Sequence, residues 1–330
     1  MEKEEEEVKE GFVLVARKGC FGLPTACPSC LPVYLYLRFA NVDFDLRFNL
    51  VHPDSDQIPY VENGDYVAYN NEKGGVIESL KEDGIVDLDS GLPSHTIPDW
   101  LSMKAMISTW LSDAVMYELW VGSDGSAARK IYFSDLPWPI GKILHLKQTY
   151  TVRQMLSITT ANAERREEEI YRKATIAYEA VSTRLGEQNF LFENRPTSLD
   201  AVFLGHSLFA LQVLPDASVL QSKLMEHNNL VRYCEKHKIE VLEAGSSSSS
   251  VPSSSFNPSS PSMPKRGTPS SWSTKSKNKP KKEKTEEEKT FRKRSKYFLA
   301  TQLVAVVLFL SLLTGGTDDE DAEGNDDVFS

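Results

Sequence analysis

The stretch Pro196–Leu211, PTSLDAVFLGHSLFAL, decides the fold class of this chain of 330 residues. Thr197 and Asp200 stand three residues apart in front of an apolar run, a Thr-x-x-Asp variant of the capping box that starts helices. From Ala201 onward the run is apolar on nearly all sides, which is typical of a helix inside a protein core. We therefore expect a buried central helix whose first turn is capped by Thr197 and Asp200.

Further helices are expected on both sides of this central helix. Met103–Ala114 carries apolar residues at spacings of three and four, and Pro98 in front of it suits a first helical turn. After the central helix, Asn228 or Asn229 can start a helix that runs to Leu242. Both patterns are amphipathic, so each predicts a helix that packs one face on the core.

A long helix is expected just before the central one. Its apolar stripe runs from Ile170 to Leu185 at spacings of four, three, four and four, and Gly186 is a natural residue beyond a helix end. Thr159 or Thr160 can cap its start. We therefore expect residues 96–244 to form an all-helical domain.

Residues 11–95 show a different pattern of short apolar runs. In chain order they predict a strand at Phe12–Ala16, a helix at Leu31–Ala40, a strand at Val42–Phe48, a hairpin of Gln57–Val61 and Tyr66–Tyr69, and a helix at Val76–Glu82. The dipeptide Asn63-Gly64 suits the hairpin turn. The resulting order, β-α-β-β-β-α, is the layout of a thioredoxin-like α/β domain.

The net charge of −10 is divided unevenly along the chain. An acidic extension at residues 1–10 carries −4, residues 11–245 carry −8, residues 246–296 carry +9 and residues 314–330 carry −7. Because the globular part is acidic, it is poorly suited to the phosphate backbone of nucleic acid. We therefore expect no nucleic-acid partner.

The number of cysteines and the composition of the first ten residues indicate the cellular compartment in which the protein is expected. Four cysteines (Cys20, Cys27, Cys30 and Cys234) are too few for a disulfide framework, so a reducing compartment is expected. The first ten residues, MEKEEEEVKE, have no apolar run and no arginine, which predicts neither a secretory signal nor a mitochondrial transit peptide. The targeting information is then expected near the C-terminus.

Tyr297–Leu313, YFLATQLVAVVLFLSLL, predicts a single transmembrane helix that anchors the chain. Seventeen uncharged residues form a helix of about 25 Å, a little short of a hydrocarbon core of about 30 Å. A core helix would need a domain to pack against, but residues 245–296 are rich in Ser, Pro and Lys and predict a disordered linker.

The residues of this anchor have two roles. Those expected to contact lipid are Tyr297, Phe298, Leu303, Val304, Val306, Val307, Leu308, Phe309, Leu310, Leu312 and Leu313. A basic flank of Arg292, Lys293, Arg294 and Lys296 can reach the headgroups and stay in the cytosol with the folded body. The acidic tail, residues 314–330, would then lie on the opposite side of the membrane from the folded body.

The linker's +9 charge has two interpretations, which the sequence leaves open. Basic residues next to an apolar helix are attracted to anionic lipid headgroups by about 1 kcal/mol each. The alternative is a solvated spacer without a specific partner.

Cys27-Pro-Ser-Cys30 is the strongest catalytic candidate. A CxxC motif at a helix start gains from the helix dipole, which lowers the pKa of the first thiol. The alternative is a pair of small buried cysteines with no chemical role. A zinc site would need two more ligands, and neither Cys20 nor Cys234 belongs to a second spaced pair. We expect no metal site.

Pro59 and His206 are two further candidates for a functional site. Pro59 stands where thioredoxin-like domains place a cis-proline beside the substrate, although an ordinary edge-strand proline fits equally well. His206 lies within the apolar central helix, where a buried core histidine is more common than a catalytic base. No nucleotide-binding loop or Ser-His-Asp spacing is present in the sequence.

A thioredoxin-like half followed by helices, with Thr197 and Asp200 at the start of a buried helix, resembles the glutathione transferase fold. Tyr69-Asn-Asn71 departs from that family's glutathione-binding pair, so we expect no cofactor. The chain more closely resembles the metaxins of plant type. The similarity is carried by Phe21-Gly-Leu-Pro-Thr25, Tyr171-Arg172, Arg184-Leu-Gly186, Gln188-Asn-Phe190, Pro196-Thr-Ser-Leu-Asp-Ala201, Asn229-Leu230 and Tyr233-Cys234.

The resemblance implies a non-enzymatic protein of the mitochondrial outer membrane. Its glutathione-transferase-like body would face the cytosol and bind precursor proteins or subunits of the import and β-barrel sorting and assembly machinery. The alternative function is a membrane-tethered thiol- or glutathione-dependent enzyme that uses Cys27 and Cys30.

Overall fold

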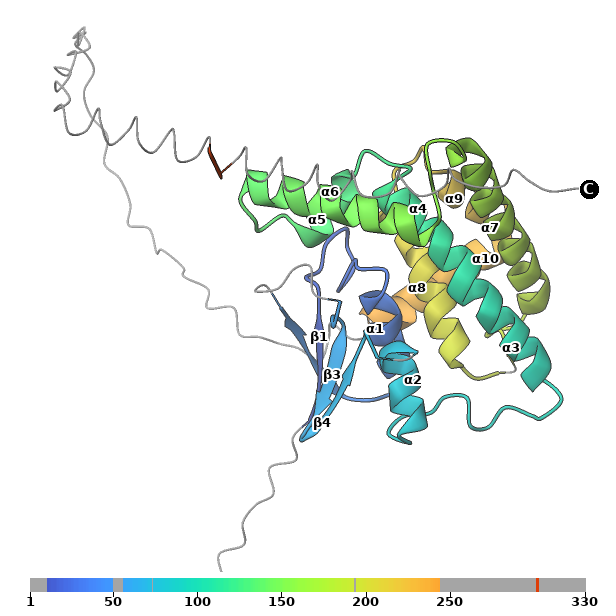
Figure 1. The fold of residues 1–330 in the computed structure, drawn as a ribbon. Coiled ribbons are helices and arrows are strands. Elements are labelled where there is room, and N and C mark those ends of the chain that lie inside the picture. The colour runs from blue at the N-terminus through green and yellow to red at the C-terminus, as the bar shows by residue number, and fades with distance from the viewer. Residues whose placement is uncertain (1–10, 50–55, 73, 193, 244–300, 303–330) are drawn as a thin grey trace, which may run out of the picture. The chain divides into compact units, whose positions relative to one another are not determined.

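The computed structural model describes residues 11–49, 56–72, 74–192, 194–243 and 301–302 (Figure 1). The chain divides into two compact units, Met1–Ser254 and Ser255–Ser330. Every described residue except the pair 301–302 belongs to the first unit, which is the body discussed below.

The body begins with a four-stranded sheet in the order β2-β1-β3-β4. The strands are β1 (Phe12–Ala16), β2 (Phe44–Phe48), β3 (Tyr60–Asn63) and β4 (Tyr66–Tyr69). β1 pairs in parallel with β2, with Leu14 opposite Leu46, and antiparallel with β3, with Leu14 opposite Val61. A parallel pair needs a crossover connection, which α1 (Cys30–Phe39) provides. Helix α2 (Gly75–Glu82) follows the hairpin, and the predicted order β-α-β-β-β-α is confirmed.

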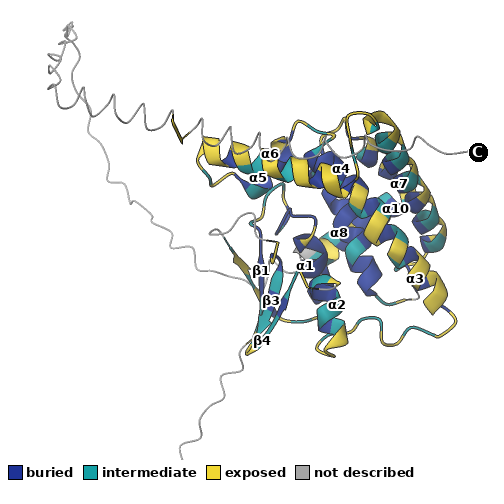
Figure 2. Ribbon diagram, viewed as in Figure 1, coloured by how far each residue is buried: buried dark blue, intermediate teal, exposed yellow. Residues whose placement is uncertain are grey.

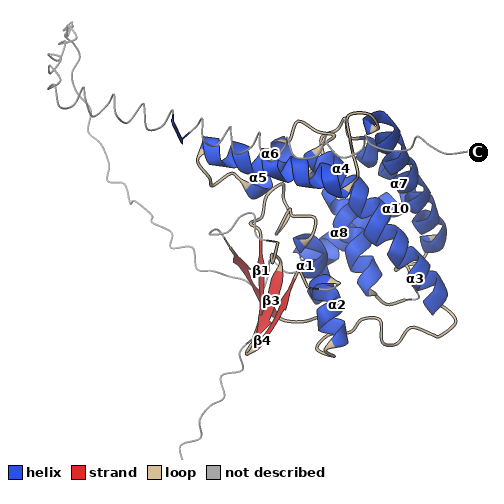
Figure 3. Cartoon of the chain, in the orientation of Figure 1, coloured by secondary structure: helices blue, strands red, loops and turns tan. Residues whose placement is uncertain are grey.

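The remaining elements are helical. They are α3 (Ile97–Met106), a π-helical turn η1 (Ile107–Leu111), α4 (Ser112–Trp120), α5 (Ser126–Tyr132), α6 (Trp138–Met155), α7 (Ala163–Leu185), α8 (Ser198–Gln212), α9 (Val219–Met225), α10 (Asn228–Lys238) and the π-helical turn η2 (Ile239–Glu243). Figure 3 shows the strands together at one edge of this body and the helices on one side of them.

Helix α8 is the buried central helix that the sequence predicted. Twelve of its 15 residues are buried, and Figure 2 shows its ribbon almost entirely in the colour of buried residues. The Thr197 backbone N–H donates to Asp200 Oδ2 at 2.9 Å, and the Thr197 side chain accepts from the Asp200 backbone N–H, which completes the capping box. The Thr197 hydroxyl also donates to Asp200 Oδ2 at 2.7 Å. Gly205 allows α8 to approach α1 closely, since a Cβ at this position would lie 2.8 Å from Pro32 Cγ.

The predicted cap of the long helix was wrong. Helix α7 begins at Ala163 after Asn162, not after Thr159 or Thr160. The Asn162 side chain accepts a hydrogen bond from the Thr159 N–H at 2.8 Å and donates to the Ser157 carbonyl at 3.1 Å, so it closes the preceding turn. At the other end the prediction is confirmed, because Gly186 follows the helix with a positive φ of 49°.

No helix among the described residues is long and apolar enough to span a membrane. The predicted anchor at 297–313, its basic flank at 292–296 and the linker from 245 lie outside the described residues, apart from Thr301 and Gln302.

Candidate functional site: a dithiol at the start of α1

Cys27 and Cys30 lie together at the first turn of α1. The carbonyl of Cys27 accepts hydrogen bonds from the N–H groups of Cys30 and Leu31 at 3.1 and 3.0 Å, so the chain already turns helically at Cys27. The Cys27 side chain is 2% exposed and that of Cys30 is fully buried. The positive end of the helix dipole therefore acts on both thiols in a site from which bulk water is largely excluded.

Two side chains from distant parts of the chain surround Cys27. The hydroxyl of Tyr132, at the end of α5, lies 3.4 Å from Cys27 Sγ. The guanidinium of Arg17, just after β1, lies 4.5 Å from the centroid of the Tyr132 ring. A phenol and a guanidinium are both suited to stabilising a thiolate, one as a hydrogen-bond donor and the other through its charge.

The two thiols differ in acidity. Burial alone would raise the pKa of Cys27, but hydrogen bonds from Cys30 and Tyr132 and the charge of Arg17 lower this pKa to about 5. Burial and the neighbouring Cys27 raise the pKa of Cys30 well above its usual value. Near neutral pH the pair therefore holds one thiolate, at Cys27, and one thiol, at Cys30.

Cys27 lines a cavity of ≈ 300 Å³ between the sheet half and the helices. Its walls include Cys27, Arg17 and Tyr132, together with Ile58 and Asn70. The Ile58–Pro59 peptide bond is cis, which agrees with the first of the two interpretations of Pro59. The volume lies at the lower end of the range for small-molecule sites, about 300–1,000 Å³.

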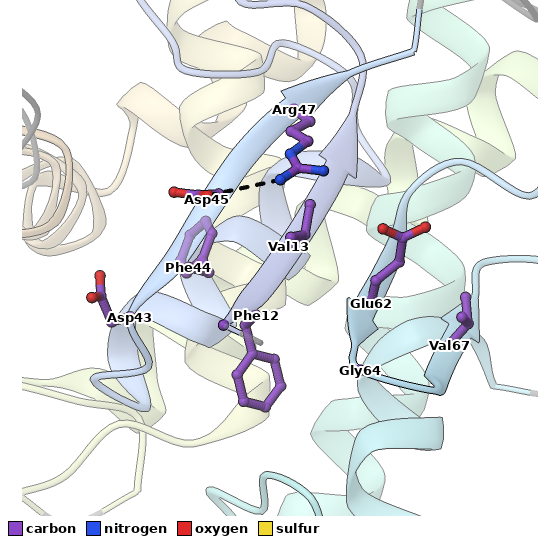
Figure 4. A pocket seen from close by; sticks show the side chains of 10 residues that line it. Phe12, Val13, Asp43, Phe44, Asp45, Arg47, Glu62, Gly64 and Val67 are labelled. Atoms are coloured by element: carbon purple, nitrogen blue, oxygen red, sulfur yellow. Dashed lines mark ion pairs between the residues drawn. The ribbon is translucent and has the colours of Figure 1, made fainter. Parts of the chain in front are cut away.

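A second hollow of ≈ 530 Å³ lies over the strands (Figure 4). Asp43, Asp45 and Glu62 line it together with Arg47, whose guanidinium lies 4.0 Å from the Asp45 carboxylate. The residues that form it include no cysteine, serine, threonine, lysine or histidine. Within the described part of the chain, no cluster of His, Cys, Asp and Glu could hold a metal ion.

Helix α6 exposes large apolar side chains, with the exposed fraction reaching 76% at Trp138, 60% at Leu146 and 55% at Tyr150. We call Trp138, Ile140, Ile143, Leu146 and Tyr150 the α6 face. The helix has no acidic residue, and its bases are Lys142, Lys147 and Arg153. A helix with large exposed apolar side chains and only basic charged residues is unusual on a body whose residues 11–245 carry −8.

The structure places the other candidates as follows. Thr197 and Asp200 have the structural role that was expected of them. His206 is 7% exposed, and burial lowers its pKa to about 4, so it is neutral near pH 7. Cys234 is fully buried, and burial raises its pKa to about 12. Sequence reasoning missed Arg17 and Tyr132, because nothing in the linear pattern connects them to Cys27.

Two family models match the chain. The model described as Glutathione S-transferase N-terminal domain matches residues 28–125, and that described as Glutathione S-transferase, C-terminal domain matches residues 174–237. An Arabidopsis thaliana protein named "Mitochondrial outer membrane import complex protein METAXIN" is 57% identical over 317 residues, which cover 96% of this chain and 97% of that protein. The chain belongs to the metaxin family.

More distant metaxins also match. Mouse Metaxin-2 is 27% identical over 64% of this chain and 81% of its own length, and mouse Metaxin-1 is 26% identical over 66% of this chain and 70% of its own length. Among solved structures, a glutathione S-transferase III in apo form aligns with 76% of this chain at 12% identity and a TM-score of 0.44. The two family models show that this metaxin has a glutathione-transferase-like body with an N-terminal α/β part and a C-terminal helical part.

Proposed function

We propose that this chain is a non-enzymatic component of the import and β-barrel sorting machinery of the mitochondrial outer membrane. The observation that carries the proposal is the identity of 57% to an Arabidopsis protein named for that import complex, over nearly the whole of both chains. An identity of this size over matching lengths supports a shared role for the two proteins.

The mechanism we propose is binding through the α6 face to a partner subunit of the machinery. Exposed apolar patches are common interaction sites, and Trp and Tyr are over-represented among residues that dominate binding energy. Lys142, Lys147 and Arg153 lie on the same helix as the α6 face. The partner surface that fits is apolar with carboxylates at its rim, because such a rim would pair with these three cations.

The anchor at 297–313 would keep this body at the membrane. The basic flank and the folded body would stay in the cytosol, and residues 314–330 would lie in the intermembrane space. A flexible coil with the composition of residues 245–296 averages roughly 35–40 Å from end to end, which sets the reach of the α6 face from the membrane.

A deletion of residues 297–313 tests the anchor. The full-length tagged chain should remain in the membrane pellet after alkaline carbonate extraction of mitochondria, and protease added to intact mitochondria should digest its body. The shortened chain should be extracted by carbonate. Retention of the shortened chain in the extracted pellet would show that the anchor lies elsewhere.

A charge substitution at Leu146 tests the α6 face. Leu146→Asp should reduce cross-linking of the full chain to the outer-membrane β-barrel subunit of the machinery by tenfold or more. The matched control is Leu101→Asp on α3, because Leu101 is 53% exposed and has the same size. Equal cross-linking by both variants would exclude the α6 face as the contact.

A further inference from the structure

We propose that Cys27 and Cys30 form a thiol–disulfide exchange site that cycles between a dithiol and an intramolecular disulfide, with a small disulfide in the adjoining cavity as its oxidant. Binding to the import machinery does not require this thiol chemistry. The exchange site and the binding role can therefore be refuted independently of each other.

The local geometry suits a disulfide between the two cysteines. Residues i and i+3 at the start of a helix lie on the same side, about 5–6 Å apart at their Cβ atoms. The hydrogen bond from the Cys30 N–H to the Cys27 carbonyl, 3.1 Å long, holds this turn closed. Because the Cβ atoms of a disulfide lie about 3.5–4.5 Å apart, forming the bond would also draw this turn tighter by roughly 1–2 Å.

The cavity beside Cys27 limits the size of the disulfide that can reach this thiol. Cys27 lines the cavity, whereas Cys30 is fully buried and does not. A reagent can therefore reach Cys27 first, and only a molecule small enough for ≈ 300 Å³ can approach it. This excludes a disulfide within a folded protein and favours a low-molecular-weight disulfide.

The surroundings of Cys27 make it the attacking group. The Tyr132 hydroxyl at 3.4 Å can donate to a thiolate, and Arg17, only 7% exposed, supplies a buried positive charge beside the same ring. A buried guanidinium is costly unless an anion lies near it. The Cys27 thiolate is such an anion, so the two groups stabilise each other's charged forms. Tyr132 and Arg17 are positioning residues in this scheme.

The reaction proceeds in two exchanges. The Cys27 thiolate attacks one sulfur of the disulfide RSSR, the S–S bond breaks, and RS⁻ leaves. The sulfur of Cys30 then attacks Cys27 Sγ in the mixed disulfide, its proton passes to a departing thiolate, and the second R group leaves. The two cysteines lose two electrons and the single proton that Cys30 carries, and RSSR becomes one RSH and one RS⁻, which takes up a proton from water. A small dithiol reverses both steps.

The other cysteines lack these features. Burial raises the pKa of Cys234 to about 12, and burial also raises the pKa of the partly exposed Cys20. Both are protonated near neutral pH, so they are poor nucleophiles. They provide internal controls for any reagent added to the whole protein.

The first test measures the disulfide itself. The full chain in detergent is equilibrated with oxidised and reduced dithiothreitol at several ratios, quenched with acid, alkylated and digested. Peptide mass spectrometry should find a Cys27–Cys30 disulfide at the oxidised end that disappears at the reduced end. Both cysteines alkylated at every ratio would overturn the proposal, as would a disulfide that joins other cysteines.

The second test assigns the roles. With bis(2-hydroxyethyl) disulfide, Cys30→Ser should accumulate one mercaptoethanol at Cys27, and Cys27→Ser should acquire none at Cys30. Alkylation of the wild-type chain by iodoacetamide should follow a pH profile with its midpoint near 5 at Cys27. Tyr132→Phe should move this midpoint upward and leave the profile of Cys20 unchanged. A Cys27 that reacts no faster than Cys20 at pH 6 would contradict the assignment.

Discussion

Replacement of Asp200 by alanine should strongly destabilise the body of this metaxin. The carboxylate is fully buried and accepts four hydrogen bonds: from the Leu191 N–H at 2.8 Å, the Thr197 N–H at 2.9 Å, the Thr197 hydroxyl at 2.7 Å and the Tyr233 hydroxyl at 3.0 Å. These contacts join the start of α8 to the preceding loop and to α10. Alanine would leave all four donors without this acceptor.

The expected loss follows from the number of donors left buried. An unsatisfied buried donor costs about 1–3 kcal/mol, and even if the Thr197 hydroxyl finds another acceptor, three donors remain, so Asp200→Ala should lower the free energy of unfolding by at least about 3 kcal/mol. Tyr233→Phe removes a single donor, keeps the ring and should cost only about 1 kcal/mol. Thr197→Ser retains the hydroxyl and should change stability least.

Urea unfolding of residues 1–254, followed by circular dichroism and tryptophan fluorescence, measures these differences. The three variants should rank with Asp200→Ala far below Tyr233→Phe, and Thr197→Ser nearest to wild type. If Asp200→Ala lost no more than Tyr233→Phe, the carboxylate would not be the centre of this network, and the reasoning would fail.

Two further predictions concern α8. Gly205→Ala places a Cβ 2.8 Å from Pro32 Cγ. The resulting overpacking should outweigh the better helix propensity of alanine and lower the free energy of unfolding by about 1–3 kcal/mol. If the same urea assay showed a stabilised variant, the close approach of α8 to α1 would be refuted. Because burial lowers the pKa of His206 to about 4, the unfolded chain binds a proton between pH 6.5 and 4 that the folded chain does not, and stability falls as the pH falls. His206→Leu should flatten this part of the pH–stability curve, and an unchanged slope would show that His206 does not contribute to it.

The sequence predicted features that depend on near neighbours. Thr197 and Asp200 are three residues apart, and Gly186 directly follows the helix that it ends. In both cases the residues that interact are close together in the sequence, so the sequence pattern alone is enough to predict the feature. The thioredoxin-like element order was predictable for the same reason, because strand alternation and helix periodicity are local. The start of α7 was predicted wrongly because Asn162, rather than Thr159 or Thr160, precedes the helix. The Asn162 side chain accepts a hydrogen bond from the Thr159 N–H and closes the turn there.

The site and the exposed surface could be predicted only in part. Cys27 and Cys30 form a visible motif, but Tyr132 lies 105 residues from Cys27 and reaches it only through the packing of α5. Helix α6 was not predicted, because its buried residues are only Gly141 and Val152 and its large apolar residues face outward. Helix prediction from hydrophobic periodicity assumes that apolar residues face the core, so it does not identify a helix whose large apolar residues face solvent.

We propose that this metaxin acts in the outer-membrane import and sorting machinery. The most direct measurement is the assembly of a radiolabelled β-barrel precursor, imported into mitochondria depleted of this chain and resolved by native electrophoresis over time. Assembly should be slower in the depleted mitochondria, and the wild-type chain and Cys27→Ser, but not Leu146→Asp, should restore its rate. Assembly at the normal rate in depleted mitochondria would contradict the proposal.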